Sequence, residues 1–165
     1  MHTINHTHET VYPHPTHTIW HHLINQLNNT GTWQHPKNTF QPGPTPPQEV
    51  TGTTLTTVHT NGPGKPGPKI HFTSTTTHTT PTSPTSPTDD RYHYTATHSG
   101  HFTGTTTITL TPLDNNTRTR LSYTFTATPQ GWTKLLPTAK IHANHTTATI
   151  ANHDILQRIL SKLDQ

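Results

Sequence analysis

Cysteine is absent from this sequence of 165 residues, and acidic, basic and apolar residues are all scarce. Without cysteine the chain has no disulfide framework and no thiolate chemistry. Ten basic and seven acidic residues leave a net charge of only +3 at pH 7 with neutral histidines. The basic residues are scattered rather than gathered in a stripe with interleaved aromatic residues, so the sequence does not favour a nucleic-acid partner.

Long apolar segments are missing as well. No run of roughly 18 apolar residues occurs, so no segment is predicted to span a membrane. The first six residues, MHTINH, lack the charged region and the apolar run of a signal peptide. We therefore expect a soluble protein in the cytoplasm.

The low apolar content raises the question of whether the chain folds at all. Only 25% of the residues are hydrophobic and 10% are charged, against roughly 45–50% and 25% in ordinary globular proteins. Disordered chains usually carry a high net charge, however, and this chain does not. About a quarter of its residues are threonine, a β-branched residue that suits strands. We therefore expect a folded chain, with residues 1–165 forming a single domain.

Alternation of apolar and polar residues predicts a series of strands. Residues 3–12 form the first, with Ile4 and Tyr12 on one face and Glu9 on the other. Five more strands are predicted at residues 48–60, 69–78, 91–98, 101–111 and 117–128. The last two alternate most regularly and indicate a hairpin with one buried face. The segments QPGPTPP (41–47) and TTPTSPTSPT (79–88) are predicted to be loops.

Helical periodicity occurs near both ends of the chain. Residues 17–26 predict a short helix whose apolar side carries Ile19, Trp20 and Leu23, and residues 28–36 predict a turn or a second short helix. A long helix is predicted over 132–163, with Pro137 ending its first turn or kinking it. Its stretch 142–149 is poor in helix formers, which predicts a weak or broken segment. The apolar stripe of this long helix comprises Trp132, Leu135, Leu136, Ala139, Ala143, Ile150, Ile155, Ile159 and Leu163.

Four short motifs carry a resemblance to a known family. They are YPHPTHTIW (12–20), where a strand leads into a helix, GTTTITLTPLD (104–114), TRTRLSYTF (117–125) and LLP (135–137). Trp33 also falls where the family often has a tryptophan. The motifs and the order of the predicted elements resemble the START-like (SRPBCC) superfamily, which includes polyketide cyclase/dehydrase-like proteins. The resemblance extends over nearly the whole chain.

The resemblance implies an α+β helix-grip fold. Two short helices follow the first strand, and a curved antiparallel sheet of about six or seven strands surrounds a long C-terminal helix. It also implies a cavity between sheet and helix that binds a hydrophobic or amphipathic molecule, such as a lipid, a quinone or a polyketide-like compound. The candidate lining residues are Phe72, Tyr92, Tyr94, Phe102, Tyr123, Phe125 and Leu136, within a larger inward set that adds Ile70, Ile108, Ala139 and Ala143. A filled core is the alternative for each of them.

Two other functions stay open. One is an enzyme of the polyketide cyclase/dehydrase type, which would move protons with a tyrosine or histidine in a deep pocket. The other is a protein-interaction module of the same fold, which an exposed apolar patch would favour. The sequence shows no paired carboxylates, no nucleophile elbow and no glycine-rich phosphate loop, and no cofactor is predicted. It does not decide whether the chain is an enzyme.

Histidine is abundant, with 17 residues. His14, His17 and His21, and separately His142 and His145, have spacings that place them on one helix face. Histidine, threonine, proline and asparagine share codons rich in A and C, however, so we interpret the histidine content as nucleotide bias and predict no metal site. Among the strand residues His71, His78 and His93, we expect at most one or two to face the cavity, where one could act as a general base.

Overall fold

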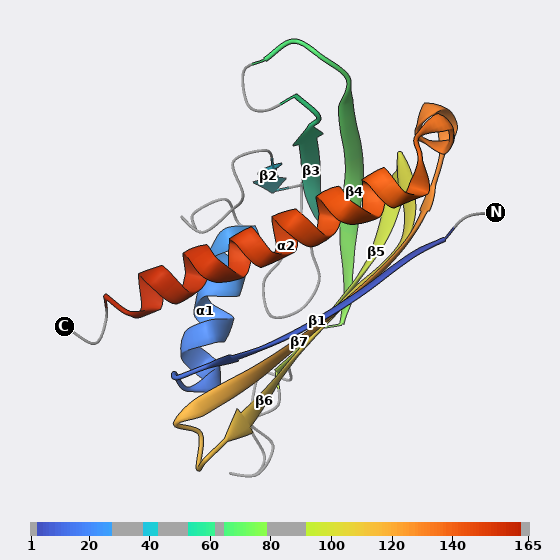
Figure 1. Ribbon diagram of the computed structural model, residues 1–165. Coiled ribbons are helices and arrows are strands. Elements are labelled where there is room, and N and C mark those ends of the chain that lie inside the picture. Colours follow the sequence, from blue (N-terminus) through green and yellow to red (C-terminus); the bar gives the residue numbers. More distant parts are fainter. Residues whose placement is uncertain (1–2, 28–37, 43–52, 62–64, 79–91, 163–165) are drawn as a thin grey trace.

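The computed structural model describes residues 3–27, 38–42, 53–61, 65–78 and 92–162. Seven antiparallel strands form one sheet in the order β1-β7-β6-β5-β4-β3-β2. The strands are β1 (Ile4–Tyr12), β2 (Asn38–Pro42), β3 (Thr53–His59), β4 (Lys69–His78), β5 (Tyr92–Gly100), β6 (Phe102–Leu113) and β7 (Arg118–Pro129). Helix α1 (Thr16–Leu27) follows β1, and the 3-10 helix η1 (Gly131–Leu135) leads from β7 to the long helix α2 (Thr138–Leu160), which crosses the curved sheet (Figure 1). The predicted α+β helix-grip architecture is confirmed.

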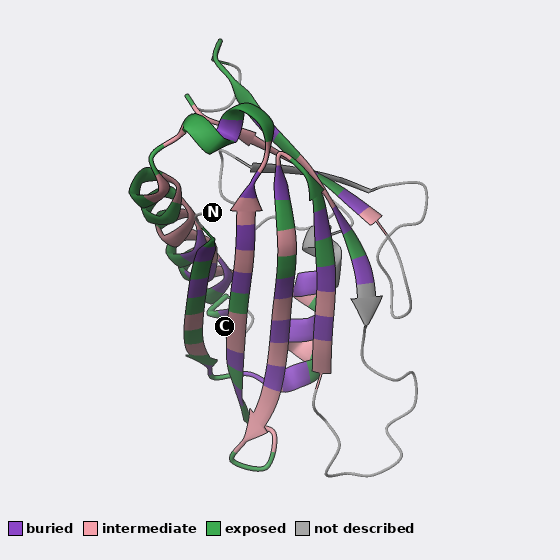
Figure 2. Cartoon of the chain, turned by 90° about the vertical axis from the view of Figure 1, so that its right-hand side faces the viewer, coloured by how far each residue is buried: buried purple, intermediate pink, exposed green. Residues whose placement is uncertain are grey.

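The predicted hairpin is the longest ladder of the sheet. In β6 and β7 the register pairs Ile108 with Tyr123 and Leu110 with Leu121. Buried and exposed residues alternate along the strands (Figure 2). In β1 the same alternation buries Ile4 and Tyr12 and leaves Glu9 exposed, as predicted. Period-two alternation therefore identifies the inner face of these strands correctly.

Strand β2 is a feature that the sequence analysis does not predict. Gln41 and Pro42 were assigned to a loop, but both belong to β2, which pairs with β3. Proline is tolerated here because β2 is an edge strand and Pro42 is its last residue. The predicted second helix (28–36), Trp33 and the loop 79–88 lie outside the described residues.

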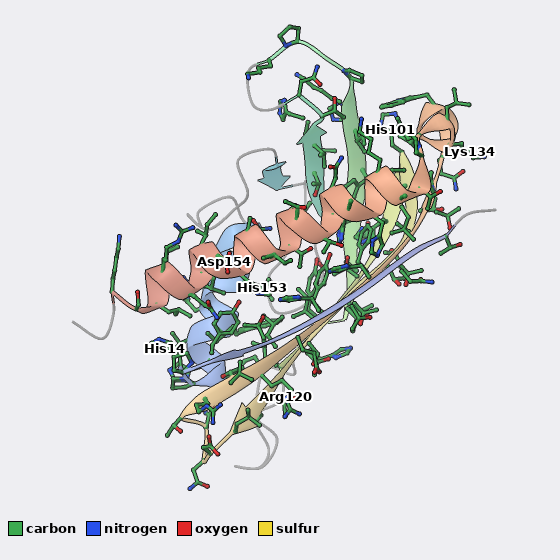
Figure 3. The ribbon with its side chains drawn as sticks, in the orientation of Figure 1. His14, His101, Arg120, Lys134, His153 and Asp154 are labelled. Atoms are coloured by element: carbon green, nitrogen blue, oxygen red, sulfur yellow. The ribbon has the colours of Figure 1, made fainter. Side chains whose placement is uncertain are left out.

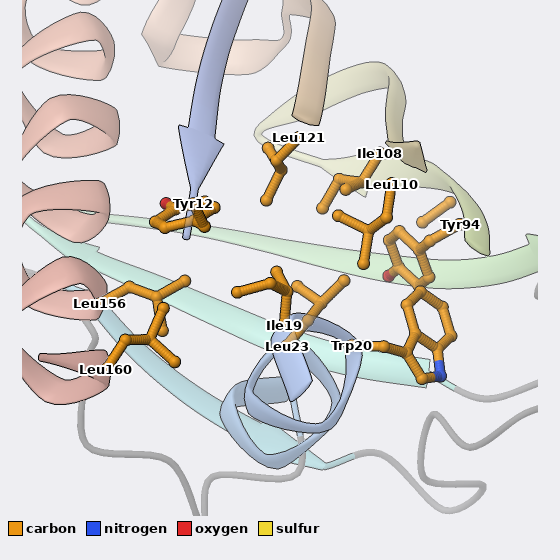
Figure 4. Packing of buried hydrophobic residues seen from close by; sticks show 11 residues of the cluster. Tyr12, Ile19, Trp20, Leu23, Tyr94, Ile108, Leu110, Leu121, Leu156 and Leu160 are labelled. Atoms are coloured by element: carbon orange, nitrogen blue, oxygen red, sulfur yellow. The ribbon is translucent and has the colours of Figure 1, made fainter. Parts of the chain in front are cut away.

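The interior between helices and sheet contains two hydrophobic clusters. The first surrounds α1 and comprises Tyr12, Ile19, Trp20, Leu23, Tyr94, Ala96, Ile108, Leu110, Leu121, Leu156 and Leu160 (Figure 4). The second comprises Ile4, Ile70, Phe102, Phe125 and Ala127. Tyr123 packs against both clusters. Buried threonines and histidines supplement this apolar interior, so the inner face is unusually polar: among the described residues, 13 polar residues are buried beside 16 hydrophobic ones.

Helix α2 presents a different face to the sheet from the predicted one. Its buried residues are Thr149, His153, Leu156 and Leu160. In contrast, Leu135 is 85% exposed, Ile150 is 45% exposed, and Ala139 and Ala143 are exposed. The predicted stripe is therefore correct only in part: Leu136, Ile155 and Ile159 pack against the hydrophobic clusters, and Leu163 lies outside the described residues. The chain leaves helical geometry at Leu136 and Pro137, where ψ is 140° and 123°. Helical phase cannot be carried from Trp132 through such a break.

The predicted weak segment of α2 is continuous helix. Helix α2 runs without interruption from Thr138 to Leu160. The hydroxyl groups of Thr147 and Thr149 donate hydrogen bonds to the carbonyl oxygens of Ala143 and His145, each at 2.9 Å. Because these hydroxyls bond back one turn along the helix, the threonines are accommodated inside it.

The turn between β6 and β7 anchors the start of α1. Asp114, Asn115 and Asn116 all have positive φ angles, between 50° and 63°. The backbone N–H and the hydroxyl of Thr16, which is fully buried, both donate to Oδ1 of Asn116 at 3.0 Å. The side chain of Asn116 thus fixes the first turn of α1 against the sheet.

We expect Asn116→Ala to lower the free energy of unfolding by about 2–3 kcal/mol, because it leaves two buried donors of Thr16 unpaired and puts alanine in the left-handed region. Asn115→Ala is the matched control, since Asn115 has a similar φ of 56° but is exposed. It should lower the free energy by only about 1 kcal/mol. Urea denaturation followed by circular dichroism measures both, and equal losses would contradict the anchoring role.

Candidate functional site

The residues predicted to line a cavity all face the interior, but they do not form one group. Tyr94 lies in the first hydrophobic cluster and Tyr92 packs against it, with its ring 5.3 Å from that of Trp20 in α1. Phe102 and Phe125 lie in the second cluster, and Phe72 and Leu136 pack against it. Tyr123 joins the two groups. The predicted facing residues Ala139 and Ala143 are exposed, so the aromatic side chains meet other residues of α2.

Histidines occupy the space between the two clusters. We call His6 and His8 of β1 together with His142, His145 and His153 of α2 the inner histidine cluster. The ring of His6 packs edge-on against those of His145 and His142, with centroids 5.1 and 5.7 Å apart. The ring of His8 stacks on that of His153 at 4.5 Å. Figure 3 shows His153 on the side of α2 nearer β1. The middle of α2 is therefore held to the sheet by imidazole rings.

His145 is the member of the cluster closest to the predicted aromatic residues. Its ring stacks on Phe125 with centroids 4.1 Å apart and planes 16° apart. Its Nε2 lies 3.1 Å from the hydroxyl oxygen of Tyr123. Burial raises the pKa of Tyr123 well above its usual value, so the phenol stays protonated and donates to Nε2. Tyr12 and His153 form a second such pair, in which the hydroxyl contacts Nδ1 and burial likewise raises the pKa of Tyr12.

Two nitrogens of the cluster are buried without a hydrogen-bond partner in the protein: Nε2 of His6 and Nδ1 of His145. The other nitrogen of each ring is bonded, to Thr146 at 3.1 Å and to Tyr123. The large majority of buried polar atoms in proteins have partners, and an unpaired one costs about 1–3 kcal/mol. The two unpaired nitrogens are therefore polar groups that lie among aromatic rings and could bond to a further polar group.

Burial favours the neutral imidazole in His6, His145 and His153. It lowers the pKa of His145 to about 3, with His6, His142 and His98 as neighbouring groups that add to the effect. It lowers the pKa of His153 to about 4 and also lowers that of His6. A neutral imidazole has one N–H donor and one acceptor nitrogen, so these three rings offer both kinds of hydrogen bond at pH 7.

His98 of β5 is also buried, but its ring is fully bonded. Nδ1 lies 2.9 Å from the hydroxyl of Ser74, and Nε2 lies 2.7 Å from that of Thr106. Burial lowers the pKa of His98 to about 4. With both nitrogens satisfied, His98 orders the interior of the sheet rather than offering a free polar group.

The interior positions of His6 and His98 were not predicted, although the alternation of each strand indicates them. His6 has the same parity in its strand as Ile4 and Tyr12, and His98 the same parity as Tyr94. Among the strand histidines that the analysis did name, His71 is exposed and His93 is half-buried, and the side chain of His78 is outside the described residues. The alternation of the strands would have identified these buried histidines. They were not considered because the high histidine content was interpreted as nucleotide bias.

A surface hollow of about 450 Å³ lies beside the C-terminal half of α2, lined by Asp154, Gln157, Arg158 and Ser161. These residues are all exposed and polar, and none belongs to the predicted lining. This hollow is therefore not the cavity that the sequence predicts.

Two further features concern the described part of the chain, namely its possible metal ligands and the character of its helices. No three histidine, aspartate or glutamate side chains there are grouped so that they could hold a metal ion. Of the predicted ligand candidates, His14 is buried and His17 is exposed. Neither of the described helices combines the length and apolar character of a membrane span.

No protein-family model and no curated protein is similar to the sequence. Solved structures do resemble the fold. A START superfamily protein from Mycobacterium smegmatis aligns over 99% of both chains with a TM-score of 0.59 and 12% identity. Ara h 8.0201 aligns over 97% of this chain and 99% of its own, with a TM-score of 0.60 and 11% identity. The Zhui aromatase/cyclase from Streptomyces sp. R1128 aligns over 95% of this chain and 90% of its own, with a TM-score of 0.57 and 13% identity.

Likeness at such low identity concerns the fold. The START-like helix-grip fold expected from the sequence motifs is confirmed by these structures. The names of these three proteins describe different properties, so similarity of fold does not identify an activity.

Proposed function

We propose that this chain, which has the START-like helix-grip fold, binds an amphipathic small molecule between α2 and the sheet. The apolar part of the molecule would lie against the second hydrophobic cluster, near Phe102 and Phe125. Its polar part would bond to His6 and His145. Ligand sites of this kind combine an apolar lining with a few convergent polar groups.

The observation that carries the proposal is the pair of buried, unpartnered nitrogens on His6 and His145. The two rings are 5.1 Å apart, so one hydroxyl or carbonyl group can reach both. The aromatic ring of Phe125 lies directly against His145. A bound polar group would remove the free-energy penalty of the unpaired nitrogens, while the apolar remainder would be buried against aromatic rings.

The Tyr123–His145 pair also fits the second candidate, an enzyme of the cyclase/dehydrase type. Buried tyrosine–histidine pairs can transfer protons to a bound carbonyl compound. A general base works best when its pKa lies near the working pH, however, and that of His145 is lowered to about 3. The pair is therefore better suited to hydrogen bonding than to proton abstraction, which favours binding over catalysis.

Titration with the apolar dye ANS at pH 7 tests the proposal. We expect saturable binding, weakened about tenfold by His145→Gln and by Phe125→Leu, because each removes one part of the lining. Ile150→Ala is the matched control on the same helix, since Ile150 is 45% exposed, and it should leave the affinity unchanged.

Circular dichroism must show that all variants are folded. Dye binding that does not saturate, or that is equal in all four proteins, would exclude this site. Native mass spectrometry of protein purified from its own host would then identify the class of any molecule that copurifies.

A further inference from the structure

The N-terminal half of α2 is attached to the sheet by unusually few apolar side chains. Leu156 and Leu160, the fully buried leucines of α2, lie in its last turns. In residues 138–149, Ile141 is the apolar side chain that packs against a hydrophobic cluster, and Ala139, Lys140, His142 and Ala143 are exposed. The other contacts that attach this half are polar or aromatic. The rings of His142 and His145 pack against His6, His145 also stacks on Phe125 and Tyr123, and Thr146 bonds to His6.

The strand pairing of the sheet does not involve helix α2. Its backbone hydrogen bonds lie within the helix. Strand β1, by contrast, is held to β7 through a continuous register from Ile4–Ala127 to Tyr12–Thr119. Side-chain contacts are therefore the main connection between the N-terminal half of α2 and the strands beneath it.

The titratable groups that face this interface are histidines and tyrosines. They are His6 and His8 from β1, Tyr123 from β7, His98 from β5, and His142, His145 and His153 from α2. Among the described residues, none of these histidines forms an ion pair with a carboxylate. Asp154 is exposed on α2, and its charge helps to raise the pKa of Tyr12 of β1, which contacts His153 near the end of α2 that stays attached. Glu9 lies on the opposite face of β1, where Ser122 bonds to it.

We propose that the N-terminal half of α2 is an acid-released lid, held on the sheet while His6, His145 and His153 are neutral and released when these rings become charged. Protonation places like charges on the rings of His6 and His145, whose centroids are 5.1 Å apart. It also adds an N–H at Nε2 of His145, which then no longer accepts the hydrogen bond of Tyr123. Leu156 and Leu160 keep the C-terminal end of α2 attached. This opening is a property of the chain alone, whereas release of a bound molecule by it rests on the proposed function.

The direction of the effect follows from the pKa values. Burial lowers the pKa of His145 and His153 from 6.5 to about 3 and about 4, so the released state binds protons first. The closed state is fully stable above about pH 6.5 and loses stability as the pH falls from there toward 4. Each such histidine changes the ratio of closed to open molecules by up to about tenfold per pH unit.

Hydrogen exchange measured by mass spectrometry at pH 7 and pH 5 tests the lid, with rates corrected for intrinsic exchange. We expect protection in residues 138–149 to fall at least about tenfold more than protection in β6 and β7. The double variant His6→Gln/His145→Gln should show a much smaller difference. His17→Gln is the control, because His17 is exposed on α1, and it should respond like the original protein.

Loss of protection in all elements together would show global acid unfolding and overturn the proposal. Unchanged protection of residues 138–149 at pH 5 would overturn it as well, as would an unaltered response of the double variant. If the double variant does not fold, the comparison of α2 with β6 and β7 in the original protein still decides. Failure of dye binding at pH 7 would count against the proposed function and leave the lid untouched.

Discussion

Substitution of Gly104 by alanine is expected to lower the free energy of unfolding by about 4 kcal/mol. Gly104 in β6 has a φ of 152°, which residues with a side chain rarely adopt. A Cβ atom there would overlap the carbonyl oxygen of Thr126 and stand 2.9 Å from Cα of Ala127. Both obstacles are backbone atoms of β7, so strands β6 and β7 would have to separate. Urea denaturation followed by circular dichroism measures the loss.

Gly131→Ala is the matched control for this substitution. Gly131 has a φ of 57°, but an added Cβ would meet no atom within 4 Å. We expect a loss of only about 1 kcal/mol, from backbone conformation alone. A similar loss in both variants would show that strand contact at Gly104 has no special role. Gly104, the first residue of the motif GTTTITLTPLD, is thus required because β7 leaves no space for a side chain.

Leu156→Ala should destabilise the protein by about 3–4 kcal/mol, because Leu156 is 1% exposed within the cluster around α1. Removing three carbon atoms from such a site takes away buried apolar surface and leaves a cavity. The midpoint and slope of a urea denaturation curve measure the change.

Ile150→Ala on the same helix is the control and should cost less than about 1 kcal/mol, since Ile150 is 45% exposed. The predicted stripe placed Ile150 on the inner face, so the pair of variants also distinguishes that stripe from the observed face. A larger loss at Ile150 than at Leu156 would contradict the orientation of α2 described above.

The strands were predictable because their signal is local. In β6 and β7, side chains alternate between interior and solvent, and Ile108, Leu110, Leu121 and Phe125 mark the inner face without reference to distant residues. Strand β4 has the predicted bounds, Lys69–His78. Strand β2 was not predicted because proline is unfavourable in a strand, except in a strand at the edge of a sheet. The edge position of β2 is a property of the sheet that the local sequence does not show.

The inner face of α2 was less accessible to sequence reasoning. Its phase depends on where the helix restarts after Pro137, which the sequence does not specify. Two of its buried positions, Thr149 and His153, carry polar residues that a hydrophobic pattern ignores. They are buried because partners from elsewhere meet them: Tyr12 contacts His153, and the helix itself accepts the hydroxyl of Thr149.

The candidate site shows the same limit. Tyr123 and Phe125 were named from alternation and do adjoin the inner histidine cluster. His6 and His145, which are 139 positions apart in the chain, meet only through the crossing of α2 over β1. The periodicity of apolar residues within a helix or strand does not predict where two distant elements cross.

The polar interior has a consequence for how stability varies with temperature. Unfolding raises the heat capacity by about 0.45 cal/K/mol for each Å² of apolar surface exposed and lowers it by about 0.26 for each Å² of polar surface. The buried threonines and histidines therefore reduce the heat-capacity increment below that of a chain of equal length with an aliphatic core. A smaller increment means a flatter stability curve. The folded state of this protein should keep a nearly constant free energy over a broad range of temperature, and cold should destabilise it little.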